Sequence, residues 1–292
     1  MTPPDQLPSP VVPFGQRLQA AVEANGPVCL GIDPHVSTLQ AWGYEDTPAA
    51  LEVFSRRLLA AADGLAAAIK PQSAFFERHG SHGIAVLEEL LAEARARRIL
   101  TILDVKRGDI GSTMSAYAEA YLRPGSPLEA DAMTVSPYLG PGSLSPCLSY
   151  IANHGKGIFA LALTSNPDGP TVQHATDAHG RSVAGTVIDF AARVNRDHGM
   201  PEGSWGSVGV VVGATVDDAL SHLGLDLAAM GGAVLAPGFG AQGARLEDRE
   251  AVFGNASSRV LISVSRAVAA VGPDPAALRA ACAQWSGREQ AS

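Results

Sequence analysis

Asp104, Lys106 and Asp109 lie within six positions of one another in residues 103–110, where an apolar run ends. Because side chains alternate along a strand, Asp104 and Lys106 share one face, and Asp109 lies just past the strand. Neighbouring carboxylates favour the charged ammonium form of a lysine. A Schiff-base lysine needs the opposite, so Lys106 is predicted to be a proton donor or a fixed cation. The same ammonium takes the place that Mg²⁺ would need, so no metal is expected.

Asp109 and the Asp104–Lys106 pair also each have a purely structural interpretation. Asp109 is placed to cap the next helix or to complement its dipole, and Asp104 is placed to form a structural ion pair with Lys106. A charge that leaves water loses hydration, and only good pairing offsets that loss. The penalty favours a functional interpretation of the pair, while the capping alternative for Asp109 stays open.

A second group of residues is suited to an anion. Glycines within residues 238–243 allow backbone N–H groups to approach a ligand closely, and Gln242 adds a neutral donor. Arg266 can fork onto phosphate oxygens, so a phosphate site is predicted here, with Pro237 at the start of its loop. The G-x-G-x-x-G spacing is not a dinucleotide fingerprint in this position, because it follows a late strand of the chain.

Eight short apolar segments are predicted to be the strands that position these groups. They alternate with Ala- and Leu-rich stretches of helical period. The predicted strands are residues 27–33, 65–71, 99–106, 132–138, 157–164, 208–215, 232–239 and 259–266. The predicted helices are residues 48–63, 81–97, 113–122, 143–153, 182–198, 216–229, 243–254 and 275–285.

These strands are apolar throughout, which is typical of parallel strands covered on both faces. Eight alternations of strand and helix predict an α/β fold of the (β/α)8 TIM barrel type, with a doubly wound open sheet as the alternative. In a barrel the carboxyl ends of all strands meet at one mouth. Polar residues gather at these ends: Asp33, Lys70, Asp104 with Lys106, Ser136, Thr164 with Ser165, Thr215 and Arg266.

Composition narrows the class of protein. The 292 residues carry a formal charge of −8, which gives no support to binding of nucleic acid or of an anionic membrane surface. Three widely spaced cysteines, odd in number, fit a reducing compartment. The first residues lack the features of a signal peptide, and no apolar stretch reaches about 18 residues, so a cytoplasmic protein is expected.

A single catalytic barrel domain is predicted over residues 14–285, with a flexible Pro-rich arm at 1–13 and a tail at 286–292. Two segments are long for loops. The insertion at 168–181 follows the fifth strand, at the end of a barrel where chemistry is expected. The insertion at 199–207 precedes the sixth strand and is expected at the opposite end.

Residues 103–113, LDVKRGDIGST, resemble the signature of orotidine 5′-phosphate decarboxylases. The D-x-K-x-x-D-I-x-x-T spacing is highly specific, whereas the Gly-rich loop and the arginine are moderately so. Similar segments follow in order along residues 14–285: LGIDP (30–34), IKPQSAFFE (69–77), LTSNP (163–167), VVGAT (211–215), APGFGAQG (236–243) and SVSRAV (263–268). KPQ and TSNP are similar to the long, type 2 subgroup of mycobacteria and some other bacteria.

The resemblance implies a homodimeric barrel that needs no cofactor. Such an enzyme converts orotidine 5′-monophosphate to UMP and CO₂ in de novo pyrimidine synthesis. By the resemblance, Lys106 donates a proton to C6 of the pyrimidine. Asp104 and Asp109 hold this lysine, and Lys70 completes an alternating array of charges.

The resemblance also implies how the substrate is bound. Asp33 matches the position that binds the ribose, and Ser165 matches the one that reads the pyrimidine edge. The phosphate is expected against Pro237, Gln242 and Arg266. In the family, part of the motif enters from the partner subunit, which here implies a role across the dimer interface for Asp109, Ile110 and Thr113.

The chemistry agrees with these roles, because loss of CO₂ leaves a C6 carbanion that no ring carbonyl is placed to delocalise. Without a cofactor, the protein must stabilise this charge electrostatically. Two alternatives remain. One is a related sugar-phosphate decarboxylase or aldolase of the 3-keto-gulonate phosphate type, which uses Mg²⁺. The other is a barrel that binds a phosphorylated ligand without catalysis. The residues that follow Lys106 in the segment KRGDI, and the phosphate contacts expected of Gln242 and Arg266, favour the nucleotide decarboxylase.

Overall fold

The chain folds into a closed barrel of eight parallel strands, each paired with its sequence neighbour and with β8 returning to β1. This computed structural model describes residues 11–216, 218–240 and 243–287. The predicted (β/α)8 fold is confirmed, and the open sheet is excluded. The strands are β1 (Val28–Ile32), β2 (Ala68–Pro71), β3 (Leu100–Arg107), β4 (Ala132–Val135), β5 (Gly157–Leu163), β6 (Gly206–Val212), β7 (Gly232–Pro237) and β8 (Val260–Val264).

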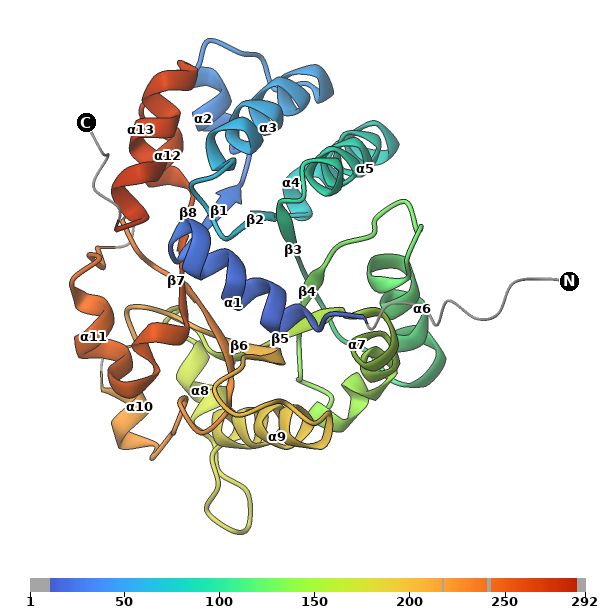
Figure 1. Cartoon of the computed structure of the whole chain (residues 1–292), viewed down its shortest axis with the longest axis vertical. Helices are drawn as coiled ribbons and strands as arrows, with labels where there is room; N and C mark the ends of the chain where they lie inside the picture. The colour runs from blue at the N-terminus through green and yellow to red at the C-terminus, as the bar shows by residue number, and fades with distance from the viewer. Residues whose placement is uncertain (1–10, 217, 241–242, 288–292) are drawn as a thin grey trace, which may run out of the picture.

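Helices surround the barrel (Figure 1). In the described part of the chain, none has both the length and the apolar character needed to cross a lipid bilayer. The α-helices are α1 (Phe14–Asn25), α2 (Val36–Ala41), α3 (Pro48–Ala62), α4 (Ala74–Glu77), α5 (Gly80–Ala96), α6 (Gly111–Leu122), α7 (Leu148–His154), α8 (Gly169–Gln173), α9 (Val183–Asp197), α10 (Ala219–His222), α11 (Asp248–Phe253), α12 (Arg266–Ala269) and α13 (Pro275–Trp285). The 3₁₀ helices are η1 (Pro141–Cys147) and η2 (Gly254–Arg259).

Several helices begin where a capping side chain satisfies a free backbone N–H group. The Thr47 hydroxyl accepts from Ala50 at the start of α3, and the Ser182 hydroxyl accepts from Gly185 in α9. Asp274 caps α13 in the same way. Such caps fix where a helix starts, because the first N–H groups have no partner within the helix.

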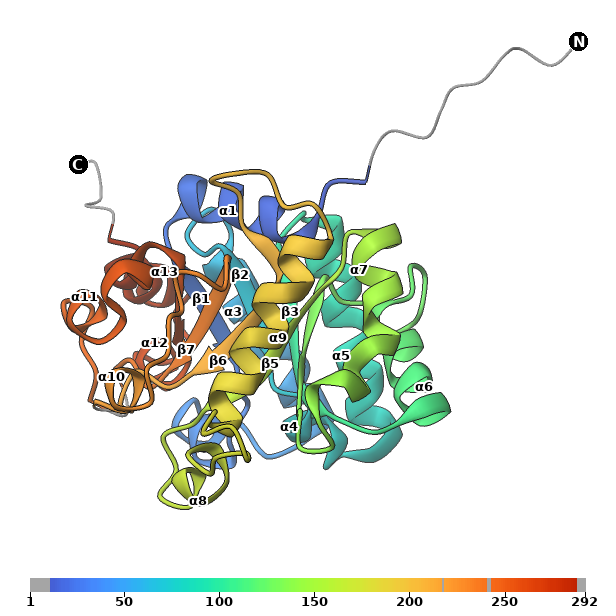
Figure 2. The same cartoon turned by 90° about the horizontal axis from the view of Figure 1, so that it is seen from below.

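Helix α1 was not predicted from the sequence, and it closes the amino end of the barrel. Figure 2 shows it across one end of the strands, with α8 at the other end. Phe14 and Leu18 are fully buried. The ring of Phe14 meets that of Phe159 edge-on, with centroids 6.1 Å apart. Trp205 belongs to the same apolar cluster, which fills the interior of the barrel.

The insertion at 199–207 lies at this amino end, as predicted. The backbone N–H of Trp205 donates to the Gln19 side chain of α1 at 3.1 Å. The Gln19 amide in turn donates to the carbonyl of Gly203 at 3.4 Å. The segment therefore helps to hold α1 in place, and it lies away from the carboxyl ends of the strands.

Some predicted helices are shorter in the structure. The helix expected at 216–229 is reduced to α10, because Gly224 takes a left-handed φ of 60° and Asp226 accepts from the backbone of Ala229. The helix expected at 243–254 is α11 alone, followed by η2. The one expected at 143–153 divides into η1, which contains prolines, and α7. By contrast, α13 matches its predicted bounds, and the predicted arm at 1–13 and tail at 286–292 remain predictions.

Candidate active site

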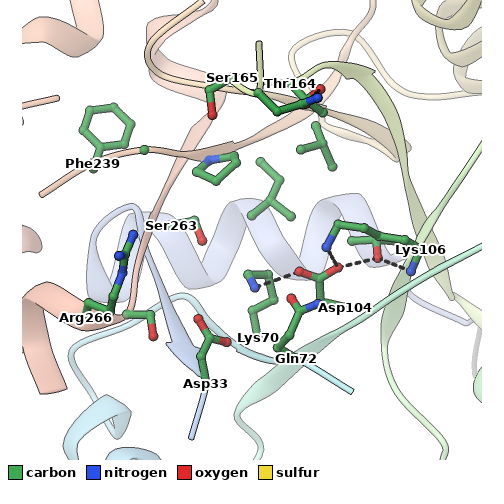
Figure 3. Close-up of a pocket in the computed structure, with 17 residues that line it drawn as sticks. Asp33, Lys70, Gln72, Asp104, Lys106, Thr164, Ser165, Phe239, Ser263 and Arg266 are labelled. Atoms are coloured by element: carbon green, nitrogen blue, oxygen red, sulfur yellow. Dashed lines mark hydrogen bonds and ion pairs between the residues drawn. The ribbon is translucent and has the colours of Figure 1, made fainter. Parts of the chain in front are cut away.

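The carboxyl ends of the strands surround a cavity of about 310 Å³ (Figure 3). Every strand contributes a residue to it or is followed by one that does. The predicted convergence of polar groups is confirmed for most strand ends, but Ser136 and Thr215 do not line this cavity. Its lining consists of Asp33, Lys70, Gln72, Asp104, Lys106, Thr134, Thr164, Ser165, Asn166, Val211, Leu235, Pro237, Gly238, Phe239, Ser263, Ser265 and Arg266.

One carboxylate holds two ammonium groups at the centre of the site. The Lys106 Nζ atom lies 2.6 Å from Asp104 Oδ1, and the Lys70 Nζ atom lies 2.9 Å from Asp104 Oδ2. The side chains of Lys70 and Asp104 are only 8% and 7% exposed, whereas that of Lys106 is 44% exposed. Lys106 and Lys70, both predicted site residues, therefore contact Asp104 directly, and Lys106 is the more exposed of the two ammonium groups.

Burial and pairing act against each other on these groups. Burial raises the pKa of Asp104, but the positive charges of Lys70 and Lys106 lower it further, to well below its usual range. Burial also lowers the pKa of Lys70, but Asp104 and then Asp33 raise it above that of an ordinary lysine. Both residues are consequently charged over the whole physiological range. The array is fixed before any ligand arrives.

The backbone beneath Lys106 is irregular. Lys106 has a φ of 44°, in the left-handed region that non-glycine residues seldom occupy. Pairing of β3 with β4 shifts between Leu103 and Arg107, so the intervening residues form a bulge. The hydroxyl of Thr134 accepts from the backbone N–H groups of Val105 and Lys106, at 3.0 and 2.9 Å. Left-handed strain of this kind is typical of functional sites.

Thr134 was missed by the sequence analysis. Its hydroxyl also donates to Asp104 Oδ1 at 2.8 Å, so it contacts the central carboxylate directly. The available signal was a polar residue inside the apolar segment that became β4. The polar residue expected at the end of this strand, Ser136, lies beyond β4.

The remaining motif residues lie outside the cavity. Asp109 accepts from the backbone N–H of Ile110 at 2.8 Å, and within the described residues no ion pair joins it to Lys106. Ile110 is 63% exposed, and Thr113 is exposed on α6. Within one chain, therefore, only one of the two motif carboxylates holds the lysine. A contribution of Asp109, Ile110 and Thr113 to a partner's site remains a prediction.

The proposed ribose and phosphate positions lie across the cavity from the lysine. Figure 3 shows Asp33 and Arg266 on the side opposite Lys106. The Oδ1 atom of Asp33 is buried and has no hydrogen-bond partner among the described residues, as expected of a group that awaits a ligand. Pro237 also lines the cavity. Gln242 lies outside the described residues.

A second missed residue anchors the insertion at 168–181. The Gln173 side chain of α8 accepts from the backbone N–H of Thr164 at 2.9 Å. It also donates to the Thr164 hydroxyl at 2.6 Å, and that hydroxyl donates to Asn166. The insertion is thereby held against the end of β5, next to Ser165, which lines the cavity as predicted.

Comparison with known proteins agrees with this geometry. The sequence model of the Orotidine 5′-phosphate decarboxylase / HUMPS family matches residues 26–281. The orotidine 5′-phosphate decarboxylase of Salinispora arenicola is 53% identical over 268 residues, covering 92% of this chain and 94% of the relative. That of Streptomyces coelicolor is 51% identical over 275 residues, covering 94% of this chain and 96% of the relative.

Solved structures give the same result. One from Streptomyces avermitilis, provisionally named an orotidine 5′-phosphate decarboxylase, superposes with a TM-score of 0.90 at 51% identity and covers 97% of both chains. The OMP decarboxylase of Leishmania donovani superposes with a TM-score of 0.72 at 30% identity, covering 94% of this chain and 96% of that one. The barrel, the charged array and these relatives together show that the chain belongs to the orotidine 5′-phosphate decarboxylase / HUMPS family.

Proposed function

We propose that this chain decarboxylates orotidine 5′-monophosphate to UMP and CO₂, with Lys106 as the proton donor. The observation that carries the proposal is the array of Lys106, Asp104 and Lys70 in one cavity with Arg266. Two relatives named orotidine 5′-phosphate decarboxylase are 53% and 51% identical to this chain. This favours the nucleotide over the sugar-phosphate substrates of other barrels.

In the proposed reaction the bond between C6 and the carboxylate breaks. Its electron pair stays on C6, the carboxyl group leaves as CO₂, and Lys106 supplies the proton that C6 gains. The neutral amine regains a proton from water. Because Asp104 holds the ammonium in place beforehand, little reorganisation is needed as negative charge develops at C6.

The other residues of the cavity are assigned to binding. Asp33 accepts hydrogen bonds from the ribose, and Ser165 reads the pyrimidine edge. Arg266 grips the phosphate together with Pro237 and Gln242. A grip remote from the reacting atoms supplies binding energy that can orient the base over Lys106.

An absorbance assay with orotidine 5′-monophosphate tests this function. We expect the signal of the substrate to disappear at the same rate with and without EDTA, because an ammonium occupies the position that a metal would take. Loss of activity in EDTA would favour the Mg²⁺-dependent sugar-phosphate alternative. Tight binding of UMP with no turnover would favour a ligand-binding barrel, and either result would contradict the proposal.

We further propose a homodimer in which Asp109, Ile110 and Thr113 complete the partner's site. The support is the exposure of Ile110 and Thr113, together with that of Tyr138 and Leu139 after β4. Apolar side chains exposed as a group are typical of a protein interface.

We also assign the protein to the cytoplasm, since its three cysteines are buried free thiols.

Complementation between two inactive variants tests the shared site. Lys106→Ala and Asp109→Ala chains, co-expressed with different tags and purified through both, form mixed dimers in which one site has lost both residues and the other has lost neither. We expect about half of the wild-type activity per mixed dimer and almost none for either variant alone. Inactive mixed dimers would show that Asp109 does not act on the partner's site.

A further inference from the structure

We propose that Thr134 is a positioning residue that holds the Asp104–Lys106 pair in its reactive geometry. The inference rests on the proposed function and adds a residue of β4 to it. Thr134 is 1% exposed and lies beneath the charged array, within the lining of the cavity. Its role follows from three hydrogen bonds made by a single hydroxyl group.

Two of these bonds fix the backbone of β3. Pairing between β3 and β4 is interrupted after Leu103 and resumes at Arg107. The N–H groups of Val105 and Lys106 both donate to the Thr134 hydroxyl, at 3.0 and 2.9 Å. Buried N–H groups must find an acceptor, so this oxygen is what allows the bulge to exist. The bulge in turn allows the left-handed φ of Lys106.

The third bond fixes the carboxylate. The Thr134 hydroxyl donates to Asp104 Oδ1 at 2.8 Å, and this same oxygen accepts from Lys106 Nζ at 2.6 Å. Thr134 therefore determines both where the lysine leaves the backbone and where the carboxylate that holds its ammonium points. Reaction rates are sensitive to displacements of about 1 Å, so this double restraint is expected to affect kcat.

The experiment compares Thr134→Val, which keeps the shape but removes the hydroxyl, with Thr134→Ser, which keeps the hydroxyl. We expect Thr134→Val to lower kcat about 10- to 100-fold, because the variant loses all three hydrogen bonds of the hydroxyl and leaves their partners unsatisfied. The KM for orotidine 5′-monophosphate and the Kd for UMP should change less than about threefold, because the binding residues are untouched. Thr134→Ser should stay within about threefold of wild type.

Thr101→Val is the matched control. Thr101 is a buried threonine of β3, and its hydroxyl bonds to Asp131 near the amino end of the barrel. Its loss should lower the melting temperature without lowering kcat. If Thr134→Val does not fold, Thr134→Ala removes the same hydroxyl with less crowding and should lose kcat to a similar extent.

Three results would overturn the inference while the wild type remains active. They are normal kcat in Thr134→Val, equal losses of kcat and of UMP binding, and a kcat for Thr134→Ser as low as that for valine. A loss of kcat in Thr101→Val would likewise show that any missing hydroxyl has this effect. A wild-type protein with no decarboxylase activity would instead overturn the proposed function itself.

Discussion

Replacing Lys106 by alanine is expected to lower kcat for orotidine 5′-monophosphate by at least about 10⁴-fold. General acid catalysis contributes about 10²–10⁴, and one preorganised charge about 10²–10³, and this residue is assigned both roles. The fold should survive, because Asp104 keeps its contacts with Lys70 and Thr134. The lost ion pair involves a partly exposed lysine, and such pairs contribute about 1 kcal/mol or less to stability.

Single-turnover absorbance measurements in EDTA, with a thermal melt of each protein, would check this result. Lys106→Arg is an informative companion variant, because arginine retains a charge but does not give up a proton. We expect it to bind UMP and to remain almost inactive. A Lys106→Ala protein that turned over at the wild-type rate would remove the mechanism, whatever the structure of its cavity.

Replacing Asp104 by asparagine is expected to damage both activity and stability. The amide preserves the shape but leaves the ammonium of buried Lys70 without its ion-pair partner. Breaking a buried pair by removing one partner costs about 3–5 kcal/mol of unfolding free energy. We expect kcat to fall at least about 10³-fold, because the ammonium of Lys106 is no longer fixed. Urea unfolding and the absorbance assay measure the two effects separately.

The loss of stability should depend on pH in a defined direction. The pKa of Asp104 is lowered in the folded protein, so its contribution is present above its ordinary value of 3.8 and is lost as pH falls. The pKa of Lys70 is raised, so its contribution is present below 10.5 and is lost as pH rises through the folded value. The difference in unfolding free energy between wild type and Asp104→Asn should therefore be flat from about pH 5 to neutral pH and shrink in acid.

Asp131→Asn provides the control for this prediction. Asp131 pairs with Arg17 at 2.6 Å and accepts from the backbone of Thr101, at the amino end of the barrel. Its replacement should lower stability and leave kcat unchanged. Equal losses of kcat in the two variants would contradict the assignment of Asp104 to the site.

The sequence allowed the barrel and the charged centre to be predicted, for a clear physical reason. Strands covered on both faces have continuous apolar sequences. Each apolar run ends where a side chain such as Asp33, Lys70 or Asp104 reaches the cavity at the mouth of the barrel. Local sequence therefore determined both the strand and the place of its polar residue. Helix α13 was equally well predicted, since Asp274 and Pro275 mark its start.

The residues that were missed depend on contacts between distant segments. Thr134 acts through a bulge in the neighbouring strand, and nothing near it in sequence indicates that bulge. Gln173 acts by folding the insertion back onto Thr164. Helix α1 was overlooked because it precedes the first strand, outside the repeating alternation of strand and helix. In each case the determining partner lies elsewhere in the fold.

Helix α1 closes the amino end of the barrel, and this arrangement determines how the stability of the enzyme can be altered. Phe14, Trp205 and Phe159 pack near the amino ends of the strands, and the charged residues lie at the carboxyl ends. Thermal stability and catalytic turnover can therefore be changed by substitutions at different sets of residues. Substitutions that improve the packing of α1 against the barrel can raise the melting temperature while the charged residues at the carboxyl ends of the strands stay unchanged.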